Sequence, residues 1–177
     1  MFEHIPSLRN LVINAIWFKV TWIACVQMGN TAALALLPLT VLLHIGFIRL
    51  DRIEWLFVFY VVVAGFVFDI LLAYFGLVVF PGGSLVPPLW LVTIWLAFGT
   101  LIVVSLPYLA RNLKLFSLLS AAMGMTSYWA GTTLSDAGLG YAASVSLPLL
   151  ALAWGVMGLL LYLIYINTAF TSNKHYA

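Results

Sequence analysis

The sequence predicts an all-α membrane protein, a single domain over residues 1–177 that forms a bundle of six transmembrane helices with both termini in the cytoplasm. The first observation is composition: 65% of the residues are hydrophobic and 7% are charged, whereas a soluble domain carries roughly 25% charged residues. The second is a series of six apolar stretches, each near the roughly 20 residues that a spanning helix needs. The third is the placement of lysine and arginine on alternate connections between these stretches.

The apolar stretches follow one another along the chain and are separated by short polar or turn-forming segments. The expected spans are 11–29, 31–49, 55–80, 89–109, 113–134 and 141–168. The segments between them are, in order, GNTAA, RLDRIE, PGGSLVPP, ARNLK and SDAGLG. Backbone groups in lipid must be hydrogen-bonded within their own segment, so each span is expected to be a helix.

Individual spans carry features that support these assignments. The first contains Asn14, Lys19 and Gln27 and lacks a small-residue cleavage pattern, so we expect a retained span rather than a signal peptide. The second and sixth contain Pro38 and Pro148, each of which removes a backbone donor and should kink its helix. The third holds an acidic residue, and the fourth and fifth carry hydroxyl residues at helical spacing.

Positive charge predicts the orientation of the bundle. The connections and tails on one side hold Arg9, Arg49, Arg52, Arg111, Lys114 and Lys174. The three connections on the other side hold no lysine or arginine. The positive-inside rule assigns the charged side to the cytoplasm, which places both termini there.

Asp69 is the acidic residue in the third span, about 21 Å along that helix from residue 55. A charged residue at this depth is costly and usually faces the bundle interior. Gly65, Ala73 and Gly76 share its helix face, and a stripe of small residues allows close approach of a neighbouring helix. Three roles stay open: a structural acceptor, a protonatable site, and a contact for the polar head of a ligand. Lys19 either pairs with Asp69 or extends to the cytoplasmic headgroups.

The other polar residues in the spans allow two interpretations. Hydroxyl and small residues at helical spacing are typical of close packing between membrane helices. They could instead line a polar pocket shared by spans one, three, four and five. The candidate residues for such a pocket or polar core are Asn14, Lys19, Asp69, Thr93, Thr100 and Tyr128.

Several functional classes find no support in the residues. A net charge of +2 without a basic patch does not favour nucleic acid as a partner. No histidines or acids have metal-ligand spacing, so we expect no metal. The sequence has no glycine-rich phosphate loop, nucleophile elbow or CxxC motif, so no cofactor is expected and an enzyme is not favoured.

Four stretches resemble a family of small bacterial inner-membrane proteins catalogued as domain of unknown function 2878. They are FKVTWIACV, FDILLAYFGLVVFPGG, PPLWLVTIWLAFGT and GMTSYWAG, and the resemblance runs from about residue 14 to residue 131. It implies a bacterial inner-membrane location and, because such genes often lie near fatty-acid-modifying and oxidative-stress genes, a lipid-linked role. This chain departs from the family pattern in having Lys19 for glutamine, Val103-Val104 for Asn-His, and Met125 for proline.

Three functional hypotheses follow. The first is a protein that binds or presents a lipid or other amphipathic ligand, with Asp69 as a polar anchor and membrane lipids as partners. The second is a small proton-coupled transporter that uses Asp69. The third is a membrane scaffold or assembly partner whose polar stripes serve packing, and these stripes suit a homo-oligomer or a contact with another membrane protein equally well.

Overall fold

The computed structural model describes residues 7–173 and is 83% helical, with six α-helices in the described part. The helices are α1 (Leu8–Met28), α2 (Asn30–Leu43), α3 (Arg52–Tyr74), α4 (Leu89–Ser105), α5 (Leu113–Leu134) and α6 (Ala143–Asn173). A π-helical turn, η1 (His44–Ile48), extends α2, and two short 3-10 turns are η2 (Pro81–Gly83) and η3 (Leu109–Arg111). The all-α prediction is therefore confirmed, with one helix for each expected span.

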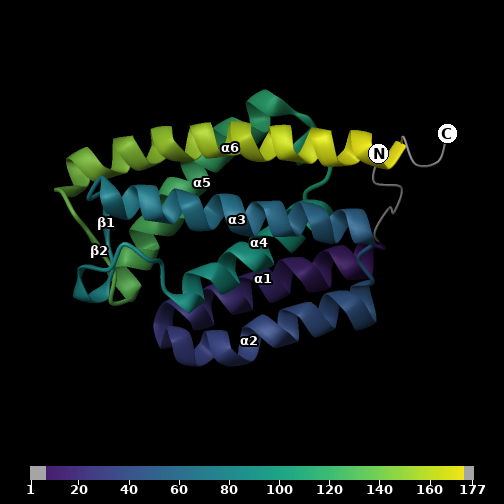
Figure 1. Ribbon diagram of the computed structural model, residues 1–177, viewed down its shortest axis with the longest axis horizontal. Coiled ribbons are helices and arrows are strands. Elements are labelled where there is room, and N and C mark those ends of the chain that lie inside the picture. Colours follow the sequence, from purple (N-terminus) through teal and green to yellow (C-terminus); the bar gives the residue numbers. More distant parts are fainter. Residues whose placement is uncertain (1–6, 174–177) are drawn as a thin grey trace.

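Successive helices alternate in direction, so the first turn of α1 and the last turn of α6 lie at the same end of the bundle (Figure 1). At the opposite end, β1 (Val78–Val79) pairs antiparallel with β2 (Gly138–Leu139), with Val78 opposite Leu139. This two-stranded ribbon ties the α3–α4 connection to the α5–α6 connection. The two helical hairpins are thereby joined at one end.

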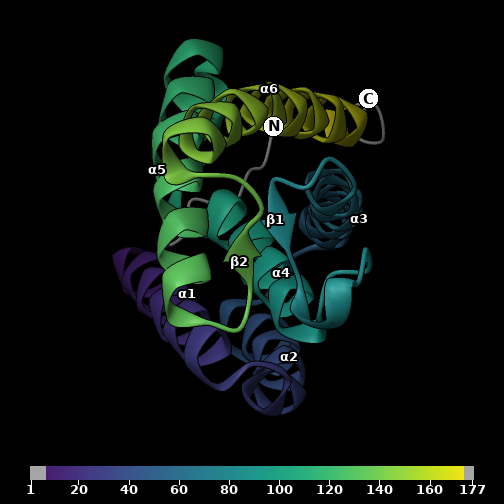
Figure 2. The same ribbon diagram turned by 90° about the vertical axis from the view of Figure 1, so that its left-hand side faces the viewer.

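The helices pack as two groups: one contains α1, α2, α3 and α4, and the other contains α5 and α6. α4 packs between α1 and α3, while α5 packs mainly against α6 and crosses it steeply (Figure 2). α1 and α5 contact each other at few points. The space that α1, α4 and α5 enclose is the feature of the fold that matters most for the candidate site.

In the part of the chain that the structure describes, four helical segments are long and apolar enough to cross a membrane: α1, α2 with its π turn (Asn30–Ile48), α3, and α6 over Ala143–Thr168. α4 is apolar but has only 17 residues, which is about 26 Å at 1.5 Å per residue. α5 is 22 residues long and carries several serines and threonines on its surface. Composition and length thus support a membrane protein.

Two predicted boundaries are wrong, and each error has a local cause. The third span was expected to reach residue 80, but α3 ends at Tyr74 because Gly76 adopts φ +66° and the Leu77 N–H bonds back to the carbonyl of Leu72 at 2.8 Å. The fourth was expected to reach residue 109, but α4 ends at Ser105, since Pro107 disfavours helix in the residue before it. Gly76 consequently lies in a turn and not on the helix face of Asp69.

Candidate functional site

The carboxylate of Asp69 is fully buried and binds two neighbouring helices. Its Oδ2 accepts a hydrogen bond from the indole N–H of Trp95 on α4 at 2.7 Å. Its Oδ1 accepts a hydrogen bond from the hydroxyl of Tyr128 on α5. Asp69 thus connects α3, α4 and α5, and each of its oxygens has a donor.

Two glycines allow two indoles to lie directly on helix backbones beside this carboxylate. A Cβ at Gly65, one turn before Asp69, would be 2.0 Å from Cδ2 of Trp95. A Cβ at Gly124, one turn before Tyr128, would likewise be 2.0 Å from Cδ2 of Trp154 on α6. The Trp95 and Trp154 rings stack at 5.3 Å with an interplanar angle of 11°. Gly65, which was predicted to allow close approach of a neighbouring helix, admits the Trp95 indole of α4.

A second buried polar cluster surrounds Asn14 on α1. Its Nδ2 donates to the Thr100 carbonyl at 3.1 Å and to Ser105 Oγ at 3.0 Å. Its Oδ1 accepts from Thr100 Oγ1 at 3.3 Å and lies 2.8 Å from Nε2 of His44. The other ring nitrogen of His44 is 2.7 Å from the carbonyl of Thr40. This cluster holds α1, α2 and α4 together and is separate from the hydrogen bonds of Asp69.

The six candidate residues therefore divide among several places. Asp69 meets Tyr128, and Asn14 meets Thr100. Thr93 is buried, and its hydroxyl donates to the carbonyl of Leu89 within α4. Lys19 is exposed on α1 and lines a cavity, and it is not among the hydrogen-bond partners of Asp69 in residues 7–173.

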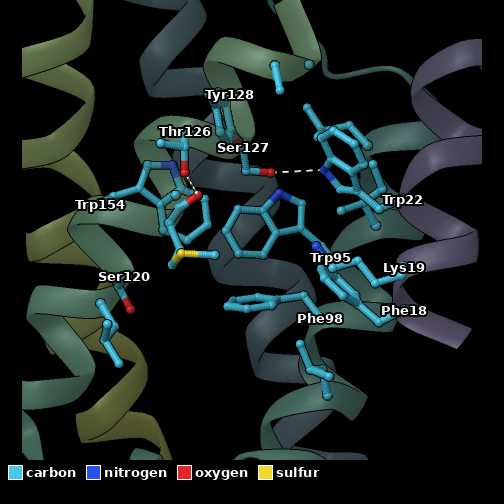
Figure 3. A pocket seen from close by; sticks show the side chains of 18 of the residues that line it. Phe18, Lys19, Trp22, Trp95, Phe98, Ser120, Thr126, Ser127, Tyr128 and Trp154 are labelled. Atoms are coloured by element: carbon cyan, nitrogen blue, oxygen red, sulfur yellow. Dashed lines mark hydrogen bonds between the residues drawn. The ribbon is translucent and has the colours of Figure 1, made fainter. Parts of the chain in front are cut away.

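The cavity has a volume of about 680 Å³ and lies between α1, α4 and α5, with Trp154 of α6 in its wall (Figure 3). Most of its lining is aliphatic or aromatic. Apart from the tryptophan indoles, the polar or charged side chains that line it are Lys19, Ser120, Thr126, Ser127, Tyr128 and Thr132. Its volume falls within the roughly 300–1,000 Å³ typical of small-molecule sites. Of the six predicted residues, Lys19 and Tyr128 contribute to it.

Hydrogen bonds already occupy most of the polar groups in this lining. Trp22 Nε1 on α1 donates to Ser127 Oγ on α5 at 2.9 Å, the cross-cavity bond drawn in Figure 3. The Thr126 hydroxyl bonds to carbonyls of its own helix, and the Tyr128 hydroxyl donates to Asp69. Within the described residues, the buried indole N–H of Trp154 has no hydrogen-bond partner. The donors left over include this N–H and the ammonium of Lys19.

The cavity opens on the flank of the bundle rather than at an end. Its exposed lining residues include Lys19 on α1, and Met123 and Thr126 on α5. All three lie near the middle of their helices, and α1 and α5 contact each other at few points. An occupant could therefore enter from the side, between these two helices.

Most of the cavity wall was missed by reasoning from the sequence. Trp22, Trp95, Phe98 and Trp154 contribute large aromatic surfaces, and none was singled out as a site residue. The available signal was weak: Ala15, Phe18, Lys19 and Trp22 follow the helical i, i+3, i+4, i+7 spacing, which packing faces share. No group of three or more His, Cys, Asp or Glu that could hold a metal occurs in the part that the structure describes.

Comparison with protein families matches residues 11–160 to the model described as protein of unknown function (DUF2878). The match covers most of the chain and includes α1 to α5 and the first half of α6. No curated protein and no solved structure matches the chain.

Proposed function

The chain belongs to the DUF2878 family, whose description assigns no activity, and from this premise we propose that it is a multi-pass protein of the bacterial inner membrane that binds or presents a lipid or other amphipathic ligand. The ligand occupies the cavity between α1, α4 and α5. In this proposal the protein serves a lipid-linked pathway as a binding protein and not as an enzyme.

The membrane arrangement has six crossings with both termini in the cytoplasm. The alternating helix directions support it. α4 is about 26 Å long, a few Å shorter than the hydrocarbon core of roughly 30 Å, and its 17 residues are at the lower limit for a spanning helix. Arg9 on the first turn of α1 packs its guanidinium over the Phe47 ring at 4.9 Å, so these two segments share one end of the bundle. Arg52 begins α3 at that end, whereas Lys174 lies outside the described residues. The positive-inside rule makes that end cytoplasmic.

The observation that carries the proposal is the apolar cavity with its opening at mid-helix on the flank of the bundle. An opening at this position faces acyl chains if the helices cross the membrane. A route for a polar solute would need a polar lining, whereas this lining is mostly aliphatic and aromatic. The cavity therefore favours an apolar or amphipathic ligand drawn from the bilayer.

One observation favours proton-coupled transport as a second candidate. Asp69 is buried among three helices, and its partner Tyr128 lines the cavity. Intramembrane carboxylates often serve proton relays. Because donors from α4 and α5 occupy both oxygens of Asp69, we favour a structural role for this residue.

Lipid mass spectrometry on the purified protein tests the proposal. Gly131→Leu should fill the cavity, because Gly131 lines it and a Cβ there meets no atom within 4 Å. Gly46→Leu is the matched control, since its Cβ also meets nothing within 4 Å and it lies outside the cavity. We expect one lipid class to be enriched with the wild type and the control and lost with Gly131→Leu. Identical bulk lipid in all three samples would contradict the proposal.

A further inference from the structure

This inference rests on the proposed function. The geometry points to a more specific ligand, a fatty acid, which is a single-chain amphiphile. Its anionic carboxylate head binds the ammonium of Lys19. Four features support this ligand: the charge of the lining, the hydrogen-bonding character of its polar groups, the depth of Lys19 and the shape of the cavity.

Among the described residues that line the cavity, Lys19 alone carries a formal charge. Ala15 and Trp22, one turn before and one turn after it on α1, line the same cavity, so the face that carries Lys19 is turned toward it. No carboxylate within residues 7–173 lines the cavity. An ammonium group beside apolar surface without an anion is unfavourable, and a bound anion would compensate it.

The depth of Lys19 makes the headgroup region a poor alternative partner. Lys19 is the twelfth residue of the 21-residue α1, about 17 Å from the start of the helix at 1.5 Å per residue. If α1 crosses the membrane, both headgroup layers are farther away than a four-carbon side chain extends. A charge held at this depth is most simply compensated by an anion that enters the bundle.

The remaining polar groups select an acceptor. The Lys19 ammonium is only a donor, so it needs an acceptor. The Tyr128 hydroxyl is already committed to Asp69, and Ser127 to Trp22. A carboxylate accepts hydrogen bonds and carries one negative charge, so it matches a single lysine in both respects.

The shape of the cavity suits one extended chain. On α5 the lining runs from Phe116 to Thr132, which is about 24 Å along the helix axis. The walls over this length are almost entirely apolar, from Leu109 near one end to Phe80 near the other. A compact hydrophobic molecule would leave much of this length empty, whereas an acyl chain would cover it.

The test measures binding of oleate, oleyl alcohol and oleoyl lysophosphatidate to the protein in nanodiscs of zwitterionic lipid. We expect oleate to bind more tightly than oleyl alcohol, which has the same chain without the charge. Lys19→Gln should weaken oleate binding by about tenfold or more and leave the alcohol unchanged. Lys19→Arg, which keeps the charge, should retain most of the affinity, and Lys114→Gln at the start of α5 is the control for an exposed cation elsewhere.

The outcomes separate this inference from the proposed function. If oleate and oleyl alcohol bind equally, and Gly131→Leu abolishes both, the cavity binds amphiphiles but the anionic head is refuted. Unchanged oleate binding by Lys19→Gln refutes it as well. If lysophosphatidate binds in a way that depends on Lys19 and oleate does not bind, the head is a phosphate and the proposed carboxylate is refuted. If none of the three binds, and no lipid class co-purifies, the proposed function fails too.

Discussion

The indole of Trp95 lies directly over the backbone of Gly65, so that a Cβ added to this glycine would be 2.0 Å from Cδ2 of the ring. From that position the indole N–H reaches Oδ2 of Asp69, one turn farther along α3, at 2.7 Å. The absence of a side chain at one position thus permits the hydrogen bond that satisfies a buried carboxylate at the next turn. This contact links the packing of α3 and α4 to the polar group between them.

Gly65→Ala should therefore destabilise the bundle even though alanine favours helices. The methyl group would displace Trp95, and overpacking of this kind costs about 1–3 kcal/mol, against a gain in helix propensity of about 1 kcal/mol. We expect a lower unfolding temperature in detergent. Gly131→Ala is the control, because its Cβ meets nothing within 4 Å, and it should be as stable as the wild type or more so. Equal stability of the two variants would show that the indole is free to move.

Asp69→Leu and Asp69→Asn should differ strongly in stability. Leucine leaves the donors of Trp95 and Tyr128 buried without acceptors, at a cost of about 1–3 kcal/mol each. Asparagine can accept from Trp95 through its oxygen and donate to the Tyr128 hydroxyl through its amide, so it should cost about 1 kcal/mol. Thermal unfolding of both variants measures the difference.

Asp69→Asn also separates a structural role of Asp69 from a role in proton transfer. If the carboxylate is structural, Asp69→Asn should bind the co-purifying amphiphile as the wild type does. If the protein couples transport to protons, Asp69→Asn should abolish that activity while the fold survives. Loss of ligand by a well-folded Asp69→Asn would argue against the structural role.

Asn14→Leu should remove the hydrogen bonds of the buried polar cluster around Asn14 and so destabilise the bundle. The substitution removes the partner of His44 Nε2, of the Thr100 groups and of Ser105 Oγ. Interhelical hydrogen bonds in membranes are worth about 0.6 kcal/mol on average, so loss of several together should cost about 2 kcal/mol. Gln27→Leu, at an exposed position of the same helix, is the control and should have little effect on the unfolding temperature.

Cysteine labelling tests the proposed number and direction of the crossings. Ser84→Cys and Asp136→Cys, both exposed in connections at one end, should react with a membrane-impermeant maleimide in intact spheroplasts. Tyr108→Cys, exposed at the other end, should react only after permeabilisation. Native Cys25 is buried and should contribute little background. Labelling of all three positions from one side would refute the six-crossing arrangement.

Local sequence patterns predict much of the fold but miss several details. Six apolar stretches became six helices because hydropathy and helix formation depend on neighbouring residues. The early end of α3 depended on the positive φ of Gly76 and on a ribbon with residues 138–139, which are distant in the chain. Hydropathy alone does not detect such a pairing, so residues 75–80 read as a continuation of the helix.

The candidate site shows the same division. Asp69 was recognisable because a carboxylate in an apolar stretch needs shelter, and it is indeed buried. Its partner Trp95 was not recognisable, since a tryptophan in an apolar span usually reads as packing or as an interfacial anchor. Lys19 was singled out for its charge, but its side chain lines a cavity and does not pair with Asp69.

The sequence by itself determined that the chain forms apolar helices, that their cationic ends gather on one side, and that one acid must lie inside, because these follow from the solvation of each residue. Only the tertiary structure decided which indole and which phenol reach that acid, and that α1 and α5 stand apart around a cavity of about 680 Å³. A cavity is volume that packing leaves unfilled. It depends on crossing angles and on contacts between residues about 100 positions apart, and no single stretch of chain encodes it.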